Sequence, residues 1–285
     1  MDELTFLGLE PEQCEYTTSK VVILPVPYDG TVSYRPGTRL GPRAIVEASS
    51  QVELLDVELG LEPWRVGLHL APPIEPVGDP ERVIAQIERA CRVHVEHGKR
   101  ILLLGGEHSV TLGAVRGLTT APDTMLQVDA HLDLRDSYDG TPYSHACVAR
   151  RVLDHGVRVV HVGPRVACPE ELAALRQHGL APIWAGDVHA APDATWIPRA
   201  VEQLGERVYV SVDVDGLDPA VIPGTGTPVP GGLGWYQLLA LLRAVGRERD
   251  VVGADLCELA PIDGQNVSEF AAALLAYKMI GYFWR

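Results

Sequence analysis

The sequence predicts an α/β fold built around one mostly parallel sheet. Two observations lead to this prediction: apolar runs suited to buried strands recur about eight times, and helical patterns separate most of them. Both a closed eight-stranded barrel and an open, doubly wound sheet fit such an alternation. Because the chain contains no internal repeat, low-complexity tract or long linker, we expect residues 1–285 to form a single domain.

The expected strands are short apolar runs, as found where a strand is buried on both faces of a sheet. They cover 20–26, 65–70, 100–104, 124–129, 157–163, 180–184, 207–213 and 250–257. The clearest helix covers 79–97, where Asp79 suits the N-cap, Pro80 the first turn and Gly98 the stop. Other helices are expected over 42–50, 108–117, 145–155, 169–178, 193–204, 234–247 and 268–282.

The composition is that of a globular protein, with 46% hydrophobic and 22% charged residues. No run of 18 or more apolar residues is present, so we expect no transmembrane helix. The first residues lack the basic segment of a signal peptide, and we therefore expect a cytoplasmic protein. The five cysteines are odd in number and scattered, which favours reduced thiols over a disulfide framework or a zinc ribbon.

The formal net charge of −14 bears on the possible partners. Such a charge disfavours nucleic acid and anionic membranes as partners, and it mildly favours a small cationic substrate. Two loops rich in Gly and Pro, at 27–42 and 223–234, lack the features of a P-loop and of a dinucleotide fingerprint. A nucleotide-binding α/β protein is therefore a disfavoured alternative.

One segment concentrates polar groups directly after an apolar run. The run 125–128 predicts a buried strand, and Asp129, His131 and Asp133 follow it at spacing i, i+2, i+4. In an extended chain this spacing places the three side chains on one face. Two carboxylates and an imidazole that converge there would repel or dehydrate one another unless a cation lies among them. The alternative interpretation is an exposed polar loop.

Three other expected strands end in residues of the same kinds. His108 follows a Gly-Gly turn, Asp213 and Asp215 end another apolar run, and Glu258 ends the last strand. A lone histidine after such a turn is more often structural, and each segment alone has an ordinary explanation. Together they place seven polar side chains at the carboxyl ends of four strands, the edge where parallel α/β sheets build their sites.

Six of these residues form a candidate ligand set of four aspartates and two histidines: His108, Asp129, His131, Asp133, Asp213 and Asp215. One divalent ion would leave a net charge of about −2 on the set, whereas two ions neutralise the four carboxylates and so favour a dinuclear site. Oxygen-rich ligation without thiolate favours Mn²⁺ over Zn²⁺.

Four motifs resemble those of the ureohydrolases, the arginase–agmatinase family of binuclear manganese amidinohydrolases. They are Gly-Gly-Glu-His-Ser at 105–109, Asp-Ala-His-Leu-Asp at 129–133, Ser-Val-Asp-Val-Asp-Gly-Leu-Asp-Pro at 211–219, and the strand that ends at Glu258. Four such motifs in the right order are specific, and the resemblance runs over most of the chain. It implies a single α/β domain with an open, eight-stranded, mostly parallel sheet and helices on both faces. It also implies a homo-oligomer, usually a trimer or hexamer.

The resemblance implies a ligand set for each of two Mn²⁺ ions per chain. One set comprises His108, Asp129, Asp133 and Asp213. The other comprises Asp129, His131, Asp213 and Asp215, so that Asp129 and Asp213 would bridge the ions. Four further histidines have no acidic partner at ligand spacing and are expected to be structural: His155, His161, His178 and His189.

Three residues are expected to act on the substrate. Asp133 would orient the attacking hydroxide and receive its proton. Glu258 would pair with the substrate guanidinium and fix its carbon over the nucleophile. The leaving amine is strongly basic and must depart protonated, and the family resemblance makes His145 the acid that supplies this proton.

Within the family the sequence looks most like the agmatinases. The indicators are the loop 27–42 and the segments 143–146 and 268–272. Two residues depart from the pattern: Glu107 stands where many relatives have Asp, and Ala146 where many agmatinases have Gly. Both departures leave the metal ligands intact and concern the substrate instead.

The segment 136–139 replaces the Asn- and Thr-rich loop with which arginases grip an α-amino acid, and its two aspartates suit a cationic tail. We therefore expect hydrolysis of agmatine to putrescine and urea, a step of polyamine biosynthesis. N1-aminopropylagmatine, guanidinobutyrate and arginine remain alternatives, because Arg35 and Arg39 could serve a carboxylate. A non-catalytic regulatory oligomer of the same fold would predict a damaged ligand set, yet none of the six ligands is missing.

Overall fold

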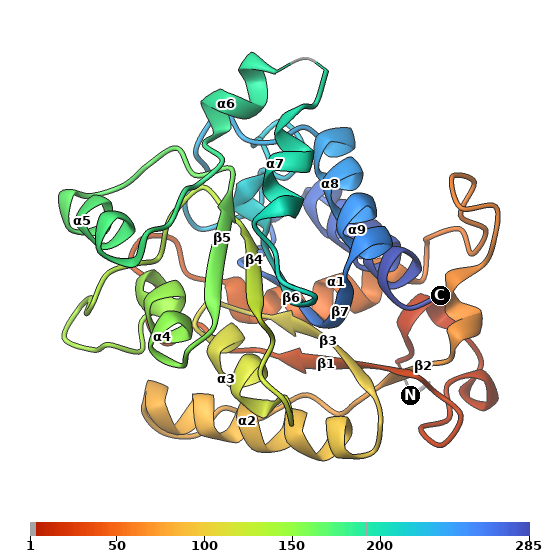
Figure 1. The fold of residues 1–285 in the computed structure, drawn as a ribbon. Helices are drawn as coiled ribbons and strands as arrows, with labels where there is room; N and C mark the ends of the chain where they lie inside the picture. Colours follow the sequence, from red (N-terminus) through yellow and green to blue (C-terminus); the bar gives the residue numbers. More distant parts are fainter. Residues whose placement is uncertain (1–3, 192) are drawn as a thin grey trace.

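The computed structural model describes residues 4–191 and 193–285, and its centre is one parallel sheet. The strands are β1 Val21–Val26, β2 Leu68–Leu70, β3 Arg100–Gly105, β4 Thr124–Val128, β5 Arg158–Val162, β6 Arg207–Asp213 and β7 Asp250–Cys257. They lie in the order β2-β1-β3-β7-β6-β4-β5, and every neighbouring pair is parallel (Figure 1). Because β2 and β5 are edge strands, the sheet is open, and the closed-barrel alternative is wrong.

The described residues form a sheet of seven strands, and the predicted eighth strand over 180–184 is wrong. Of this run only Ile183 pairs with the sheet, through a single bridge to Val162. Three residues explain why the pairing stops there. Gly179 ends the preceding helix in the left-handed conformation, Pro182 has no N–H to donate to a ladder, and the next helix begins at Ala185.

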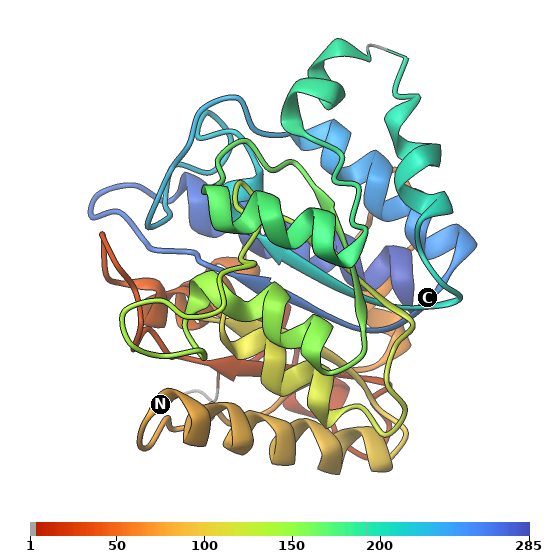
Figure 2. The same cartoon turned by 60° about the vertical axis from the view of Figure 1, so that its left-hand side comes forward.

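Helices cover both faces of the sheet. They are α1 Gly41–Ser49, α2 Pro80–Glu96, α3 Val110–Gly117, α4 Val148–Asp154, α5 Pro169–His178, α6 Ala185–Ala190, α7 Trp196–Glu202, α8 Trp235–Glu248 and α9 Val267–Phe283. One hydrophobic core joins the sheet to α2, α3, α4 and α5, and the other joins it to α1, α7, α8 and α9 (Figures 1 and 2). Sequence analysis missed only the short α6. None of the described helices is both long and apolar enough to cross a membrane.

The strands form because their side chains satisfy two cores at once. In β6, Val208, Val210 and Val212 belong to the core beneath α8 and α9, while Tyr209 between them belongs to the opposite core. This alternation follows from the period of two residues in a strand. A continuous apolar run therefore predicts a strand buried on both faces, as the sequence indicates here.

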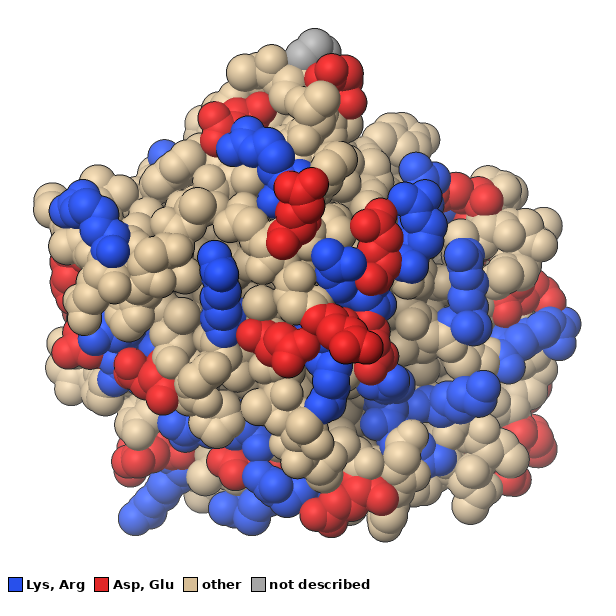
Figure 3. Space-filling model, in the orientation of Figure 1, with Lys and Arg blue, Asp and Glu red and all other residues tan. Residues whose placement is uncertain are grey.

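Part of the negative charge lies inside the protein. The buried acidic residues are Asp56, Glu107, Asp129, Asp133, Glu171, Asp213, Asp215, Asp255 and Glu258. On the face drawn in Figure 3, acidic and basic side chains are interspersed. The formal charge of −14 therefore overstates the negative charge that the surface presents.

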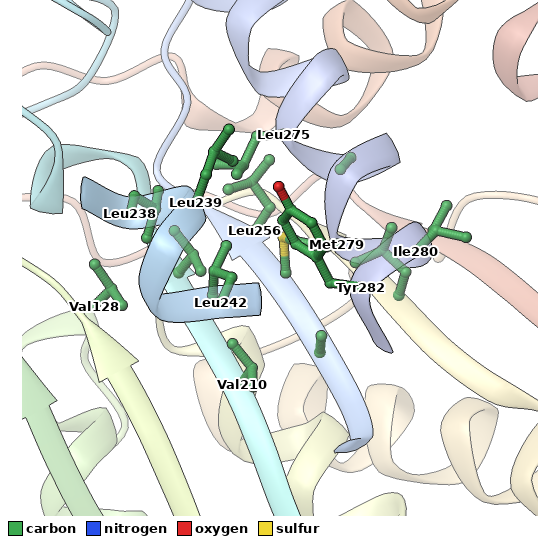
Figure 4. Close-up of a cluster of buried hydrophobic side chains, with 14 of the residues drawn as sticks. Val128, Val210, Leu238, Leu239, Leu242, Leu256, Leu275, Met279, Ile280 and Tyr282 are labelled. Atoms are coloured by element: carbon green, nitrogen blue, oxygen red, sulfur yellow. The ribbon is translucent and has the colours of Figure 1, made fainter. Parts of the chain in front are cut away.

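A cluster of buried hydrophobic side chains lies between the sheet and the helices α8 and α9. Leu242 of α8 contributes to a buried cluster with Val210 of β6, Leu256 of β7 and Met279 of α9 (Figure 4). These contacts hold β6 and β7 against two helices and so fix the positions of their carboxyl ends.

We expect Leu242→Ala to lower the free energy of unfolding by about 2–5 kcal/mol, because it leaves a cavity in a fully buried site. Leu172→Ala, at an exposed position of α5, is the matched control and should cost about 1 kcal/mol or less. Urea denaturation of the two variants measures the difference. Equal losses of stability would contradict the assigned packing.

Candidate metal centre and pocket

The candidate site lies at the carboxyl ends of four adjacent strands, β3, β7, β6 and β4. His108 follows β3, and the segment 129–133 follows β4. Asp213 is the last residue of β6, and Glu258 comes directly after β7. The strands are far apart in the sequence, but their order in the sheet makes these four ends neighbours.

The chain around the site is more bent than the sequence spacing suggests. Residues 129–133 are not extended, and Asp133 and Glu258 have left-handed φ angles of 51° and 66°. Asp215 lies in a 3₁₀ turn, Val214–Gly216, and not in the strand. The expectation that spacing along an extended chain aligns the three residues after β4 is therefore wrong. Strained backbone of this kind is common at functional sites.

The donor atoms form two sets that share Asp129. His108, Asp129 and Asp133 form one, Asp129, His131 and Asp215 form the other, and the donor atoms of each set lie within 4.8 Å of one another. Asp129 Oδ2 lies 3.1 Å from His108 Nδ1, and Asp129 Oδ1 lies 3.4 Å from His131 Nδ1. The two oxygens of one carboxylate thus face two different imidazoles, as a group that bridges two ions would.

Asp213 lies beside the first set, with Oδ2 3.5 Å from His108 Nδ1. Its other oxygen accepts the Asp215 N–H at 2.8 Å. Asp129 is fixed in the same way: Oδ1 accepts the N–H of His131 at 2.6 Å. Oδ2 accepts the amide of Gln127 at 2.7 Å. Backbone and amide donors therefore hold these carboxylates before any ion binds.

Ser211 and Asp255 fix the orientation of the His108 ring on the side away from the carboxylates. Its Nε2 lies 2.8 Å from Ser211 Oγ, and Ser211 Oγ in turn donates to Asp255 Oδ1 at 2.7 Å. Ser211 donates its hydroxyl proton to Asp255 and can therefore only accept a hydrogen bond from His108. The Nε2 atom of His108 must then carry the proton, and Nδ1 faces the carboxylates. Nδ1 is buried and makes no hydrogen bond within the described part of the chain. An unpaired nitrogen that faces three carboxylates fits a metal ion.

The electrostatics of the cluster also call for cations. Burial, together with the neighbouring carboxylates Asp215 and Asp129, raises the pKa of Asp213 well above its usual value. Burial and Asp129 raise the pKa of Asp133 to about 7. Burial opposes protonation of His131, but Asp215 and Asp129 outweigh it and raise its pKa to about 12. Protons and cations compete for this charge, so the donor set suits metal ions.

The pocket above these donors is lined by His145, Tyr138, Arg135, Arg35, Thr227 and Glu258, among others. The expectation that the aspartates of the segment 136–139 bind a cationic tail finds no support, because neither Asp136 nor Asp139 is among the described residues that line the pocket. Asp136 is exposed and pairs with Arg151 at 2.6 Å. Arg135, just before this segment, and Tyr138 within it line the pocket instead, and Asp139 is exposed like Asp136.

The two arginines considered for a carboxylate differ in position. Arg35 lines the pocket and donates to Pro261 O at 3.3 Å. Arg39 pairs with Asp29 at 3.3 Å and is mostly exposed. Only Arg35 of this pair is therefore available to a bound molecule.

Sequence reasoning missed one residue, Arg165, that supports the site without lining the pocket. Arg165, just after β5, donates from Nη2 to the carbonyls of Asp215, Leu217 and Val229. It thereby ties the loop 223–234 to the turn that carries Asp215. In the sequence, Arg165 stands in a loop after an expected strand, outside any recognised motif. Nothing in this position indicates its role.

His161 is structural, as expected. Burial lowers its pKa to about 4, so the ring is neutral. Its Nε2 lies 2.9 Å from Leu132 O and supports the loop between His131 and Asp133. The histidine thus supports the site without facing the pocket.

Comparison with known proteins agrees with this geometry. Residues 19–281 match the model of the Arginase family. The chain belongs to the arginase family. It is 40% identical over 278 residues to the N(1)-aminopropylagmatine ureohydrolase of Synechocystis, which covers 94% of this chain and 90% of the relative. It is 37% identical over 271 residues to the agmatinase of Pyrococcus horikoshii, covering 91% and 90% of the two chains.

The similarity extends to solved structures of the arginase family. The structure of agmatine ureohydrolase from Thermoplasma volcanium matches with a TM-score of 0.89 and 32% identity, over 99% of this chain and 94% of that chain. The resemblance to the ureohydrolases drawn from four sequence motifs is thereby confirmed.

We expect Ser211→Ala to weaken metal binding by about 10- to 100-fold, because the N–H of His108 loses its acceptor. Titration of Mn²⁺ into metal-free protein measures this change. Ser49→Ala removes another buried hydroxyl, in α1, and should leave metal affinity unchanged. Wild-type affinity in Ser211→Ala would show that the serine does not orient His108.

Proposed function

We propose that this arginase-family protein hydrolyses a guanidino compound to urea and an amine with two Mn²⁺ ions per chain. The observation that carries the proposal is the buried pair of donor sets that share Asp129, beneath a pocket lined by Glu258 and His145. One ion would be held by His108, Asp129, Asp133 and Asp213. The other would be held by Asp129, His131, Asp213 and Asp215.

The bound ions supply charge neutralisation and a hydroxide nucleophile near neutral pH. The protein supplies the positioning. Glu258 accepts the His108 N–H through Oε1 at 2.7 Å, which leaves its second oxygen for the substrate. Burial and the nearby Glu107 raise the pKa of Glu258 to about 8. A guanidinium in the pocket would offset this repulsion and so be drawn to Glu258.

Two residues of the pocket move the protons. Asp133 receives the proton released as the nucleophile attacks the guanidino carbon. His145 lines the same pocket. Burial lowers its pKa to about 4, so it is neutral at rest. It must therefore first accept a proton, which it then passes to the basic leaving amine.

The relatives support two closely related substrates. Agmatine is the substrate expected from the sequence, and N1-aminopropylagmatine carries the same guanidinobutyl group with a longer amine tail. The second is favoured by the 40% identity to a relative of that name. A guanidino carboxylate is a further candidate, because Arg35 and Arg135 line the pocket.

We also propose that residues 1–285 form one ureohydrolase domain that assembles into a cytoplasmic homo-oligomer, a trimer or hexamer. The single sheet and the family match over residues 19–281 support the domain. The oligomer and the compartment rest on the family resemblance and on the sequence.

The test is urea release from agmatine, N1-aminopropylagmatine, guanidinobutyrate and arginine by the Mn²⁺-loaded protein, with the metal counted in the same samples. Two Mn²⁺ per chain and a preference for the amine-tailed substrates would support the proposal. A preference for guanidinobutyrate would indicate that Arg35 and Arg135 bind the carboxylate of the substrate tail. Bound metal without urea from any of the four would overturn the proposed activity.

We expect Glu258→Gln to lower kcat/KM by about 10- to 150-fold. This corresponds to the loss of about 1.5–3 kcal/mol, the contribution of a hydrogen bond to a charged group such as the substrate guanidinium. The amide has the same size and can still accept the His108 N–H, so metal content should not change. Initial rates and metal analysis measure the two effects. Loss of metal in this variant would contradict a role for Glu258 in substrate binding alone.

We expect Mn²⁺ affinity to rise with pH between about 6 and 8. The pKa of Asp133 in the metal-free site is about 7, so below that pH the residue holds a proton that the ion must displace. Above the pKa no proton is displaced from this residue, and binding becomes stronger. Isothermal titrations across this range measure the change. An affinity independent of pH would contradict the raised pKa.

A further inference from the structure

Glu107 is a fully buried acid that the proposed mechanism leaves without a task. It follows β3, next to His108, and both of its oxygens are engaged. Oε2 accepts the backbone N–H of Thr31. Oε1 accepts the hydroxyls of Thr31, at 2.6 Å, and of Ser109. A buried carboxylate with this many donors is strongly held in place.

Thr31 connects this carboxylate to His145. The threonine lies in the loop 27–42, and its Oγ1 accepts the backbone N–H of His145 at 3.0 Å. The same oxygen lies 3.3 Å from Nδ1 of the His145 ring. A hydroxyl has one proton, and here it is donated to Glu107. Thr31 can therefore meet the ring only as an acceptor, which requires that Nδ1 carries the proton.

The remaining neighbours of the ring agree with this orientation. Ser144 Oγ also lies 3.3 Å from Nδ1 and can accept from it. The Tyr138 ring packs edge-on against the imidazole, with the ring centroids 5.8 Å apart. Nε2 has no hydrogen-bond partner among residues 4–191 and 193–285, and His145 lines the pocket. The lone pair of Nε2 is therefore left for a proton from the substrate side.

We propose that Glu107 and Thr31 are positioning residues that act on His145 through one chain of hydrogen bonds. The chain runs from the Glu107 carboxylate to the Thr31 hydroxyl and on to Nδ1–H of the imidazole. It selects the tautomer in which Nε2 can accept a proton. This inference rests on the proposed function, in which His145 protonates the leaving amine.

The arrangement also explains why the loop 27–42 matters to a site built on strand ends. The loop supplies Thr31, and Glu107 holds Thr31 by both its backbone and its side chain. The shift of a catalytic group by about 1 Å can cost 100-fold in rate. The contacts of Thr31 with Glu107 and His145 can therefore affect proton transfer although Thr31 is not a metal ligand.

The test compares Thr31→Val with Thr31→Ser in the full-length, Mn²⁺-loaded protein. Valine has nearly the same shape and keeps the backbone N–H to Glu107 but lacks the hydroxyl, whereas serine keeps it. We expect kcat to fall by about 10- to 100-fold in Thr31→Val, with KM and metal content within about threefold of wild type, and Thr31→Ser to restore most of the rate. Equal kcat in the two variants would overturn the inference.

A second readout does not depend on activity. Nitrogen NMR of histidine-labelled protein, with diamagnetic Mg²⁺ in place of Mn²⁺, reports which ring nitrogen of His145 carries the proton; a His145→Asn variant assigns the signal. We expect the Nδ1–H tautomer in the wild type and in Thr31→Ser, and its loss in Thr31→Val. An Nε2–H tautomer in the wild type would overturn the inference.

The two measurements distinguish a failure of the proposed function from a failure of the hydrogen-bond chain. If the wild type releases no urea from the substrates tested but shows the Thr31-dependent tautomer, the proposed function fails and the hydrogen-bond chain stands. If the wild type is active and its tautomer does not depend on Thr31, the chain fails and the function stands. Glu107→Gln provides a further check. Its amide would place an N–H group where Glu107 accepts a hydrogen bond from Thr31, so the variant should show the same fall in kcat and the same loss of the Nδ1–H tautomer as Thr31→Val.

Discussion

The structure depends on one constraint: several carboxylates are buried together where four parallel strands end. Buried charges are stable only when they are paired, and here the partners within the protein are two imidazoles. Burial and the neighbouring carboxylates raise the pKa values of Asp133 and Asp213, as expected where carboxylates outnumber their cationic partners. Divalent cations would compensate for this excess of carboxylates, and the surrounding architecture can be understood as the means of holding this donor set in place.

Several parts of the donor set are held by neighbours that do not line the pocket. Ser211 and Asp255 orient His108 from within the sheet. Arg165 holds the turn of Asp215 through backbone carbonyls, and His161 supports the loop before Asp133. These contacts come from strands and loops that the cores beneath α2 and α8 keep rigid. Such support is what a preorganised metal site requires.

Different residues of the pocket suit different tasks. Glu258, after β7, offers a carboxylate for a guanidinium, while His145, ahead of α4, offers an imidazole for proton transfer. Tyr138, Arg135 and Arg35 also line the pocket, whereas Asp136 and Asp139 are not among its described lining residues. An aromatic ring can receive an ammonium through its π face, and arginine can receive a carboxylate. The residues that line the pocket are thus compatible with a substrate tail that ends in an amine or in a carboxylate.

The sequence by itself determined the fold class, the family and the set of polar residues at the strand ends, because apolar runs and short motifs are local properties. It did not determine the loss of the eighth strand, which Pro182 and the start of α6 at Ala185 decide. Nor could it show that Asp136 turns outward to Arg151, or that Glu107 reaches His145 through Thr31. These outcomes depend on left-handed turns and on contacts between residues far apart in the chain. Only the tertiary structure brings such residues together, since neither periodicity nor spacing encodes which distant side chains meet.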